Sequence, residues 1–358
     1  MTLDFSGPYR YPPPRPEWLA LHQEDILDPD LPIVDPHHHI WDLNGHVYDL
    51  AQLRADVSAG HKVVATVFVQ AYHDYRETGP EHLRCVGETE HIESAAAGAS
   101  ASGSWPFLCA GIVGFADMML GERVAEVLQA HNAASPGRFR GVRHSVGRDP
   151  HFPNGIVLRP AQDRLLAEPR FRVGLAAVAR QGLSFDAMLY HCQIPELTAV
   201  AQALPELPVV LDHFGTIIGV GPYVGREQET FQTWRTDIRE LSRCPNVSVK
   251  LGGMGMVMTG AHFHERAMPP DSTELARSWR PFVDTCIEAF GVERCMFESN
   301  FPVDKGMFSY TVLWNAFKRL SAGASAHEKA ALFGTTAARF YRLPQPVHDL
   351  LMTPDTSA

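Results

Sequence analysis

Short runs of apolar and β-branched residues recur along the chain and alternate with longer stretches whose apolar residues follow a helical period. A buried strand is short and continuously apolar, whereas a helix buries only one face. In Gly121–Asn132 that face is a stripe of Val124, Val127 and Leu128. Eight runs are expected to be strands: Leu31–Ile40, Lys62–Ala71, Phe107–Gly114, Phe139–Val146, Leu183–Tyr190, Pro208–Phe214, Asn246–Gly252 and Arg294–Asn300.

Alternating strands and helices predict a parallel sheet, and eight such units close into a barrel. A doubly wound open sheet is the alternative, but a Gly-rich turn would follow its first strand, and here Trp41, Asp42 and Leu43 stand there. The sequence therefore predicts an α/β fold, a distorted (β/α)8 TIM barrel with long strand-to-helix loops. The chain of 358 residues is long enough for one such barrel.

The pattern divides the chain into three parts. Residues 1–30 are rich in proline and carry Tyr11 and Trp18, which predicts an extended arm that packs on its own barrel or on a second subunit. The barrel is expected over residues 31–342, and a C-terminal tail over residues 343–358.

Three strand-to-helix loops look oversized, namely Tyr72–Pro106, Thr216–Arg226 and Gly252–Asp271. The first contains a Gly/Ala/Ser-rich piece, Ala95–Ser104, that we expect to be mobile. All three lie on the face where a barrel carries its site, so they are candidate lids or candidate contacts of a homo-oligomer.

Composition narrows the range of partners. The chain has 31 basic and 41 acidic residues and a formal net charge of −10, which argues against nucleic acid and anionic membranes and leaves small-molecule substrates open. There is no run of about eighteen apolar residues and no signal-like N-terminal segment, so we expect a soluble, cytoplasmic protein. The six cysteines lack Cys-x-x-Cys spacing and are expected to be reduced packing residues.

Paired histidines end the first predicted strand. His37 and His39 point to the same face, about 6–7 Å apart by strand rise, and two such imidazoles are a good start for a divalent metal site. His38 faces the other side and is expected to pack. A tetrahedral ion has at least two further positions, for which His213 and His191, at the ends of the sixth and fifth strands, are candidates. The alternative for the pair is that both are surface or satisfied core histidines, and the alternative for His213 is a histidine that bonds a neighbouring carbonyl.

Other polar residues also stand where predicted strands end, which is the end of a barrel that carries the site. Arg143 and Lys250 would be cations at the mouth, and a guanidinium matches a carboxylate with two bonds, so an acidic substrate is indicated. The alternative for Lys250 is a salt bridge to Glu298 or Asp212 inside the barrel. Further candidate substrate contacts are His144 and Tyr72.

Three segments carry a resemblance to a known family: Val34–Asp42, Leu211–Gly215 and Met296–Pro302. Over roughly residues 31–342 the chain resembles the amidohydrolase superfamily. The similar branch is that of metal-dependent TIM-barrel hydrolases (amidohydrolase 2), which contains sugar lactonases and pyrone-dicarboxylate and muconolactone-type lactonases.

The resemblance implies hydrolysis of a lactone or amide bond, or decarboxylation, usually with zinc or another divalent ion such as manganese. Some lactonases of the branch work without a metal. The paired histidines of the family map onto His37 and His39, and the later histidine of the lactonases maps onto His213. A histidine of the decarboxylase relatives maps onto His191.

The eighth predicted strand departs from the family pattern. The pattern ends in Gly-Ser-Asp-x-Pro, whereas Asn300 replaces the aspartate here, and an amide cannot serve as a general base. Asp304 and Glu298 are the carboxylates near enough to substitute for it. We expect Asp304 to be the base, because a loop residue can reach over the mouth; if neither carboxylate reaches, His213 is the base of a metal-free site.

The sequence thus predicts a hydrolase that opens a lactone or a related cyclic ester or amide, by water attack at a His-lined, metal-assisted site. Its substrate is expected to be a small molecule with a carboxylate. A non-oxidative decarboxylase on the same site is one alternative. Another alternative is a relative that binds a small molecule without turning it over, and Asn300 in place of the family aspartate would indicate it.

Overall fold

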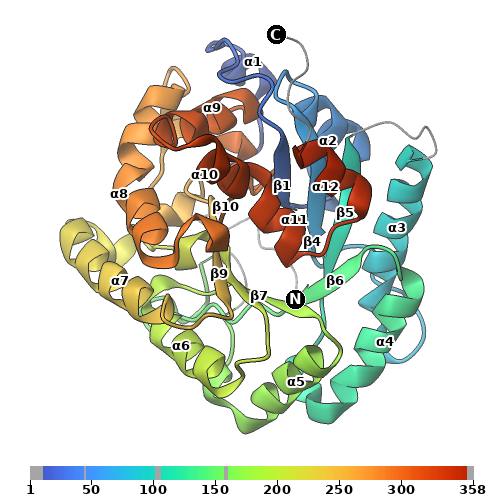
Figure 1. Cartoon of the computed structure of the whole chain (residues 1–358). Helices are drawn as coiled ribbons and strands as arrows, with labels where there is room; N and C mark the ends of the chain where they lie inside the picture. The colour runs from blue at the N-terminus through green and yellow to red at the C-terminus, as the bar shows by residue number, and fades with distance from the viewer. Residues whose placement is uncertain (1–10, 44–45, 101–105, 157–159, 353–358) are drawn as a thin grey trace.

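The computed structural model describes residues 11–43, 46–100, 106–156 and 160–352. Eight parallel strands form one sheet, and a bridge between His38 and Phe301 nearly closes it into a barrel (Figure 1). In spatial order the strands are β1 (Ile33–His38), β4 (Val63–Val69), β5 (Phe107–Gly114), β6 (Phe139–Arg143), β7 (Ser184–Ala187), β8 (Val209–Leu211), β9 (Val247–Leu251) and β10 (Cys295–Phe297). All eight predicted strands are present, and the barrel prediction is confirmed.

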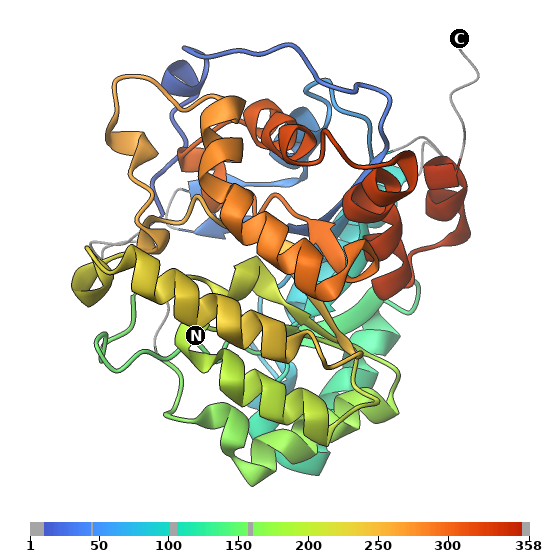
Figure 2. The same cartoon turned by 60° about the vertical axis from the view of Figure 1, so that its left-hand side comes forward.

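Helices surround the strands and cover the outside of the barrel (Figures 1 and 2). Those that follow the barrel strands are α2 (Leu50–Val57), α3 (Val86–Ser100), α4 (Val124–Ala134), α5 (Pro169–Arg180), α6 (Ile194–Ala203), α7 (Glu227–Leu241), α8 (Ser272–Phe290) and α9 (Tyr310–Leu320). Several begin at a capping side chain: Asp49 caps α2, Asp271 caps α8 and Ser309 caps α9, each by accepting from a free backbone N–H of the first turn.

Shorter elements complete the chain. A two-stranded antiparallel hairpin follows β1, and one-turn to two-turn helices stand at both ends of the chain. These elements are α1 (Pro16–Leu19), β2 (Trp41–Leu43), β3 (His46–Tyr48), α10 (Ala326–Ala330), α11 (Thr336–Phe340) and α12 (Gln345–Met352). Within the described ranges, no helix combines the length and the apolar character that a bilayer crossing would require.

Strand β8 shows how the barrel separates an apolar layer from a polar one. Val210 packs with Tyr341 in an apolar cluster inside the barrel, whereas Val209 packs in the larger cluster between strands and helices. Because side chains alternate along a strand, the next inward position after Val210 is Asp212. The same alternation on the other strands places charged side chains above the apolar layer.

Two segments that we expected to be irregular are helical. The loop predicted over Tyr72–Pro106 contains α3, because the alanines that suggested a mobile segment are also the best helix formers; residues 101–105 lie outside the described ranges. The tail predicted over residues 343–358 contains α12, whose Val347 and Leu351 are buried against the apolar cluster inside the barrel. In the N-terminal arm, the one-turn helix α1 interrupts the expected extended chain.

Candidate active site

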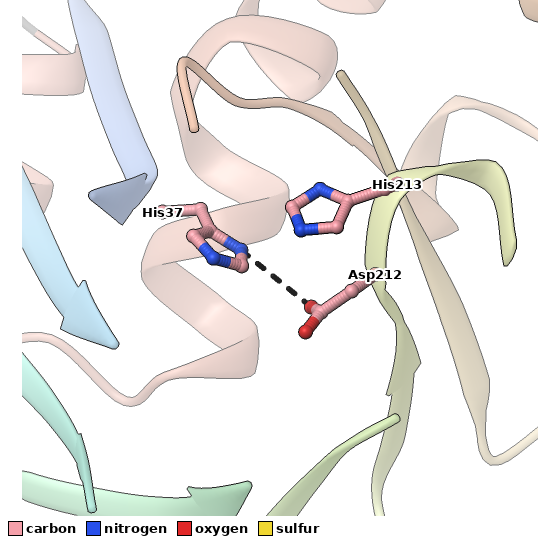
Figure 3. A group of neighbouring side chains, drawn as sticks. All are labelled: His37, Asp212 and His213. Carbon is pink, nitrogen blue, oxygen red and sulfur yellow. Dashed lines mark ion pairs between the residues drawn. The ribbon is translucent and has the colours of Figure 1, made fainter. Parts of the chain in front are cut away.

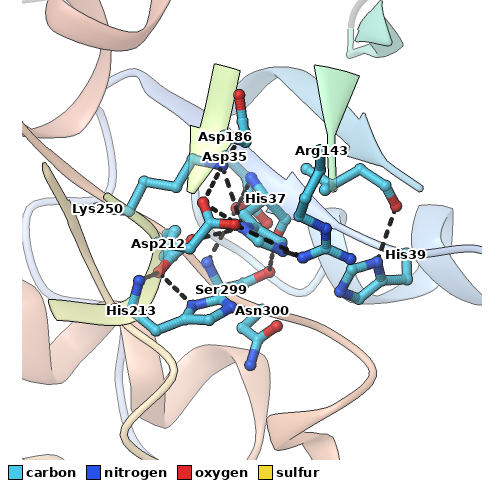
Figure 4. Close-up of polar contacts among 12 residues, drawn as sticks. Asp35, His37, His39, Arg143, Asp186, Asp212, His213, Lys250, Ser299 and Asn300 are labelled. Atoms are coloured by element: carbon cyan, nitrogen blue, oxygen red, sulfur yellow. Dashed lines mark hydrogen bonds and ion pairs between the residues drawn. The ribbon is translucent and has the colours of Figure 1, made fainter. Parts of the chain in front are cut away.

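A layer of buried charges crosses the inside of the barrel at the C-terminal ends of its strands (Figure 4). Lys250 is completely buried, and its ammonium donates to Asp186 Oδ2 at 2.8 Å and lies 3.0 Å from Asp212 Oδ1. Burial lowers the pKa of Lys250, but the two carboxylates outweigh it, so the net pKa is raised. Tyr341 also donates to Asp186, at 2.6 Å, from the apolar layer beneath. Lys250 is therefore a fixed cation in a salt bridge to Asp212, the arrangement that was its alternative role.

Next to this group, His213 and Glu298 form a hydrogen-bonded pair. His213 Nδ1 donates to Glu298 Oε1 at 2.7 Å, and the backbone N–H of His213 donates to the same oxygen at 3.2 Å. Burial lowers the pKa of His213, but Glu298 raises it above its ordinary value. Burial raises the pKa of Glu298, yet His213 and His37 bring it down to about 2. With Nδ1 held in this way, His213 presents Nε2 for chemistry.

The strand-one histidines meet His213 at the centre of the barrel. Ring centroids of His37 lie 5.0 Å from His39 and 4.6 Å from His213. His37 has both nitrogens close to protein groups: Nδ1 lies 2.8 Å from Glu298 Oε2 and 3.1 Å from Lys250 Nζ, and Nε2 lies 3.3 Å from Arg143 Nη1. Burial, followed by Lys250, lowers the pKa of His37 to about 4.

His39 is arranged differently. Its Nδ1 donates to Val69 O at 2.8 Å, so Nε2 is the ring nitrogen that remains for other contacts. The residue lines the cavity above the charged layer. Burial lowers the pKa of His39 well below its usual range, so the ring is neutral and its Nε2 can only accept or ligate. His38, as predicted from alternation, points to the other face and bonds with Thr66.

A small cavity of about 30 Å³ lies above these groups. Arg143 lines it; Nη2 donates to Gln70 O at 2.6 Å, while its Nε–H has no partner among the described residues. Buried Gln70 and the hydroxyl of Tyr72 also line it, and neither makes a well-directed hydrogen bond among the described residues. The full lining is Tyr11, His39, Trp41, Gln70, Ala71, Tyr72, Arg143, Ser145, Met188, His213, Met256, Asn300 and Val303.

Some residues that the sequence singled out stand away from this cavity. His144 faces the helices, where Nδ1 accepts from Met118 N at 3.2 Å and the ring packs near Phe171, because its neighbour Arg143 takes the inward position. His191 lies beside Tyr223 and accepts from a backbone N–H with Nδ1.

Asp304, expected to be the base, lies behind Asn300 and is not part of the lining. Its Oδ2 accepts from Gly255 N at 2.9 Å and its Oδ1 accepts from Asn300 Nδ2 at 3.1 Å. Burial raises the pKa of Asp304 to about 7. The carboxyl group therefore holds Asn300 and the loop after β9 in place, and its role as base stays a prediction that this geometry does not favour.

Several residues of the lining had weak signals in the sequence or none. Ser145 follows Arg143 by two positions, so strand alternation could have placed it on the same face. Gln70 stands at the end of the second strand and drew less weight than a charged residue. Tyr11 belongs to the N-terminal arm, and nothing in its local pattern connects it to a strand end.

The donor set suits a divalent cation. His37, Asp212 and His213 offer ligand atoms that all lie within 4.8 Å of one another (Figure 3). Both oxygens of buried Asp212 accept no well-directed hydrogen bond, although Lys250 and Arg143 lie within ion-pair distance of them. Imidazole and carboxylate are ligands that zinc takes. The same atoms already receive positive charge from the two cations, with which a metal ion would compete.

Comparisons with known proteins match the chain to a family model and to individual proteins. The model of the family described as Amidohydrolase matches residues 34–343. An uncharacterized protein of Sinorhizobium fredii is 36% identical over 233 residues, which are 65% of this chain and 70% of the relative. An L-fucono-1,5-lactonase of Burkholderia multivorans is 29% identical, over 66% of this chain and 73% of the relative.

Among solved structures, an amidohydrolase of Burkholderia multivorans with bound zinc is similar in fold. The TM-score is 0.65 and the identity 24%, over 87% of this chain and 99% of that chain. The family match begins at residue 34, after the N-terminal arm.

Proposed function

The chain belongs to the amidohydrolase family, and from this premise we propose that it is a hydrolase that opens the ring of a lactone by adding water to the acyl carbon. The observation that carries the proposal is the His213–Glu298 pair at the floor of the cavity, beside the guanidinium of Arg143. A histidine whose Nδ1–H is held by a carboxylate is an oriented general base.

In the first step, His213 Nε2 takes a proton from the attacking water as the new C–O bond forms. Glu298 keeps Nδ1 protonated and stabilises the imidazolium that results. Its ionised state is favoured, since its pKa is held at about 2. The reaction thus begins with water, a neutral imidazole and an intact lactone.

The tetrahedral oxyanion then needs positive charge. Arg143 is the cation that lines the cavity, and its unpaired Nε–H can donate to this oxygen or to a substrate carboxylate. Collapse of the intermediate breaks the ring C–O bond, and the alkoxide that leaves takes the proton back from His213. The products are a carboxylate and a hydroxyl on one open chain, with a proton released to solvent.

The types of ligand atom at the same centre also suit a divalent ion. His37, Asp212 and His213 would hold it, and it would supply Lewis-acid polarisation of the carbonyl. His213 Nε2 cannot both bind a metal ion and accept a proton from water. The metal-free and the metal-dependent forms of the proposal therefore differ in one measurable way. Removal of metal by chelation leaves the rate unchanged if His213 is the base, and abolishes it if the ion is required.

The polar lining supports an oxygen-rich substrate. Gln70 offers an amide donor and an amide acceptor without well-directed partners, and Tyr72 offers a hydroxyl, so a ring that carries hydroxyl groups or a carboxylate would satisfy them. The relative named as an L-fucono-1,5-lactonase supports a sugar lactone. We therefore propose hydroxylated and carboxylated lactones as the substrate class.

A lactone panel tests the proposal. Purified protein should open at least one sugar or carboxylated lactone, followed by proton release and by NMR of the product. His213→Ala should lower kcat by roughly 10³-fold, and His327→Ala, at an exposed histidine, should leave it unchanged. Turnover of no lactone or amide by folded protein would remove the proposal.

The decarboxylase alternative has less support. Metal coordination by His191 would favour it, and His191 is not among the residues that line the cavity. Release of carbon dioxide from an aromatic or ring-cleavage acid would still distinguish it. Stoichiometric binding of a lactone without product would instead indicate a protein that binds and does not react.

A further inference from the structure

The N-terminal arm lies outside the residues that match the family, 34–343, yet it contributes to the cavity wall. Tyr11 lines the cavity together with Tyr72, Arg143 and Asn300, side chains that come from three different strand ends. We infer that Tyr11 is a specificity-determining residue, which closes one side of the cavity and limits the size of the substrate. This inference rests on the proposed function.

Anchors on the β9–α8 side of the mouth hold the arm. Trp18 is 8% exposed, and its indole Nε1–H donates to the carbonyl of Arg266 at 2.9 Å. Arg15 donates to the carbonyl of His264 in the same loop, and its guanidinium stacks 4.6 Å above the Trp18 ring. These contacts fix the arm a few residues after Tyr11.

A second anchor lies on the β10 side. The carbonyl of Pro12 sits so close to Gly306 that a Cβ on this glycine would lie 2.1 Å from the oxygen. Gly306 ends the short 3-10 helix that begins at Asp304, directly after the loop of Asn300. Both anchors follow Tyr11 in the chain, on the neighbouring β9 and β10 sides of the mouth, and together they hold the arm where Tyr11 lines the cavity.

The surroundings of Tyr11 give its hydroxyl a role as well. Burial raises the pKa of Tyr11, so the phenol stays protonated, and Arg143, Asp304 and Tyr72 are among the groups that act on it. A protonated phenol in the wall can donate to a substrate oxygen while its ring excludes solvent. Removal of the ring and removal of the hydroxyl should thus have separable effects.

For the ring, Tyr11→Ala should open the cavity. We expect the ratio of kcat/KM for a large lactone to that for a small one to rise about tenfold, because a steric limit is lost. For the hydroxyl, Tyr11→Phe should keep this ratio and raise KM alone. Leu21→Ala, at a residue of the same arm that is 54% exposed, is the matched control and should change neither.

A second measurement needs no substrate. Diethyl pyrocarbonate modifies accessible imidazole nitrogens, and mass spectrometry can follow His39 and His213 separately. Both should react several-fold faster in Tyr11→Ala than in the unmodified chain or in Leu21→Ala. Equal rates in all three proteins, or an unchanged ratio of kcat/KM for the large and the small lactone in Tyr11→Ala, would overturn the inference. If the unmodified chain opens no lactone, the proposed function fails while the modification rates still decide whether Tyr11 closes the cavity.

Discussion

Three residues of the cavity wall hold a left-handed backbone conformation that side chains rarely adopt. Their φ angles are 60° at Tyr72, 55° at His213 and 55° at Asn300. Such a residue costs on the order of 1–3 kcal/mol and persists where the surrounding structure enforces it. In each case the turn comes within three residues of the end of a barrel strand, at the mouth of the cavity. Asn300, as an asparagine, tolerates this conformation better than most residues would.

The pH dependence of the rate follows from the His213–Glu298 pair. The base must be neutral, and Glu298 raises its pKa, so kcat/KM should fall as the pH drops through a value above the ordinary 6.5 of histidine. In Glu298→Gln the imidazole loses the nearby charge, which should move this acid limb to lower pH. The plateau rate should also fall by roughly 10²-fold, because orientation is lost.

Rate against pH, measured for both proteins on one lactone, checks this prediction. Glu229→Gln, on an exposed face of α7, is the control and should reproduce the original profile. An acid limb that stays in place in Glu298→Gln would show that His213 is not the group that titrates.

Competition between Lys250 and a metal ion is the second prediction for single residues. Lys250→Met removes the cation that Asp186 and Asp212 share, which should cost about 3–5 kcal/mol of stability. A divalent ion would supply the missing charge, so zinc should raise the melting temperature of the variant more than that of the original chain.

Thermal unfolding with zinc and with chelator measures the difference. Lys329→Met, which breaks a surface salt bridge to Asp28, should respond to zinc as the original chain does. Equal zinc shifts in Lys250→Met and in the original chain would contradict the competition.

At the scale of elements, the loop after β9 sets the position of the catalytic pair. Gly253 has a φ of 71°, and a Cβ on it would lie 2.6 Å from His213 Cγ. On the preceding position, a Cβ on Gly252 would lie 2.4 Å from Glu298 Cγ. Two glycines at a strand end thus make room for the two side chains of the pair. In the sequence this loop stood out by its length.

Gly253→Ala should therefore displace His213. We expect kcat to fall at least about tenfold, because small misplacements of a catalytic group are costly, in addition to about 1 kcal/mol for the left-handed backbone. Gly182→Ala is the matched control: its φ is 66° and nothing lies within 4 Å of the added Cβ. The control should lose similar stability and no activity, and an equal loss of activity in both variants would contradict the prediction.

The elements also show which features of the fold and of the site the sequence patterns could predict. Strand alternation and strand ends were enough to place His37, His39, His213 and Arg143 around one centre, because these depend only on local periodicity. The pattern was misread at α3, where alanines allow both a helix and a flexible segment. The contact between the arm and the cavity joins residues that are distant in the chain, and no local period encodes it.

On the scale of the whole molecule, the C-terminal segment completes the barrel. Tyr341 closes the interior from below and bonds to Asp186, which in turn holds Lys250. Helix α12 packs against the same apolar cluster through Val347 and Leu351. The order of strands in the barrel could be predicted from eight regular repeats. The closure of the barrel interior by the C-terminal segment could not be predicted, because it depends on which apolar residues beyond the last repeat fold back beneath the strands.

Removal of one such side chain should destabilise the fold. Leu351 is buried and lies against Gly334, where a Cβ would come within 2.4 Å of its side chain. Leu351→Ala should lower the free energy of unfolding by about 2 kcal/mol, whereas Met352→Ala, at the exposed neighbour, should leave it unchanged. Urea unfolding measures both, and equal midpoints would show that α12 does not support the barrel.

The most direct test of the central claim is the fate of oxygen from water. A lactone opened by the protein in water labelled with ¹⁸O should carry one labelled atom in the new carboxylate, seen by mass spectrometry, and His213→Ala should form this product at a greatly reduced rate. Label in the new hydroxyl group, or undiminished labelling of the carboxylate by His213→Ala, would contradict attack on the acyl carbon by water that His213 activates.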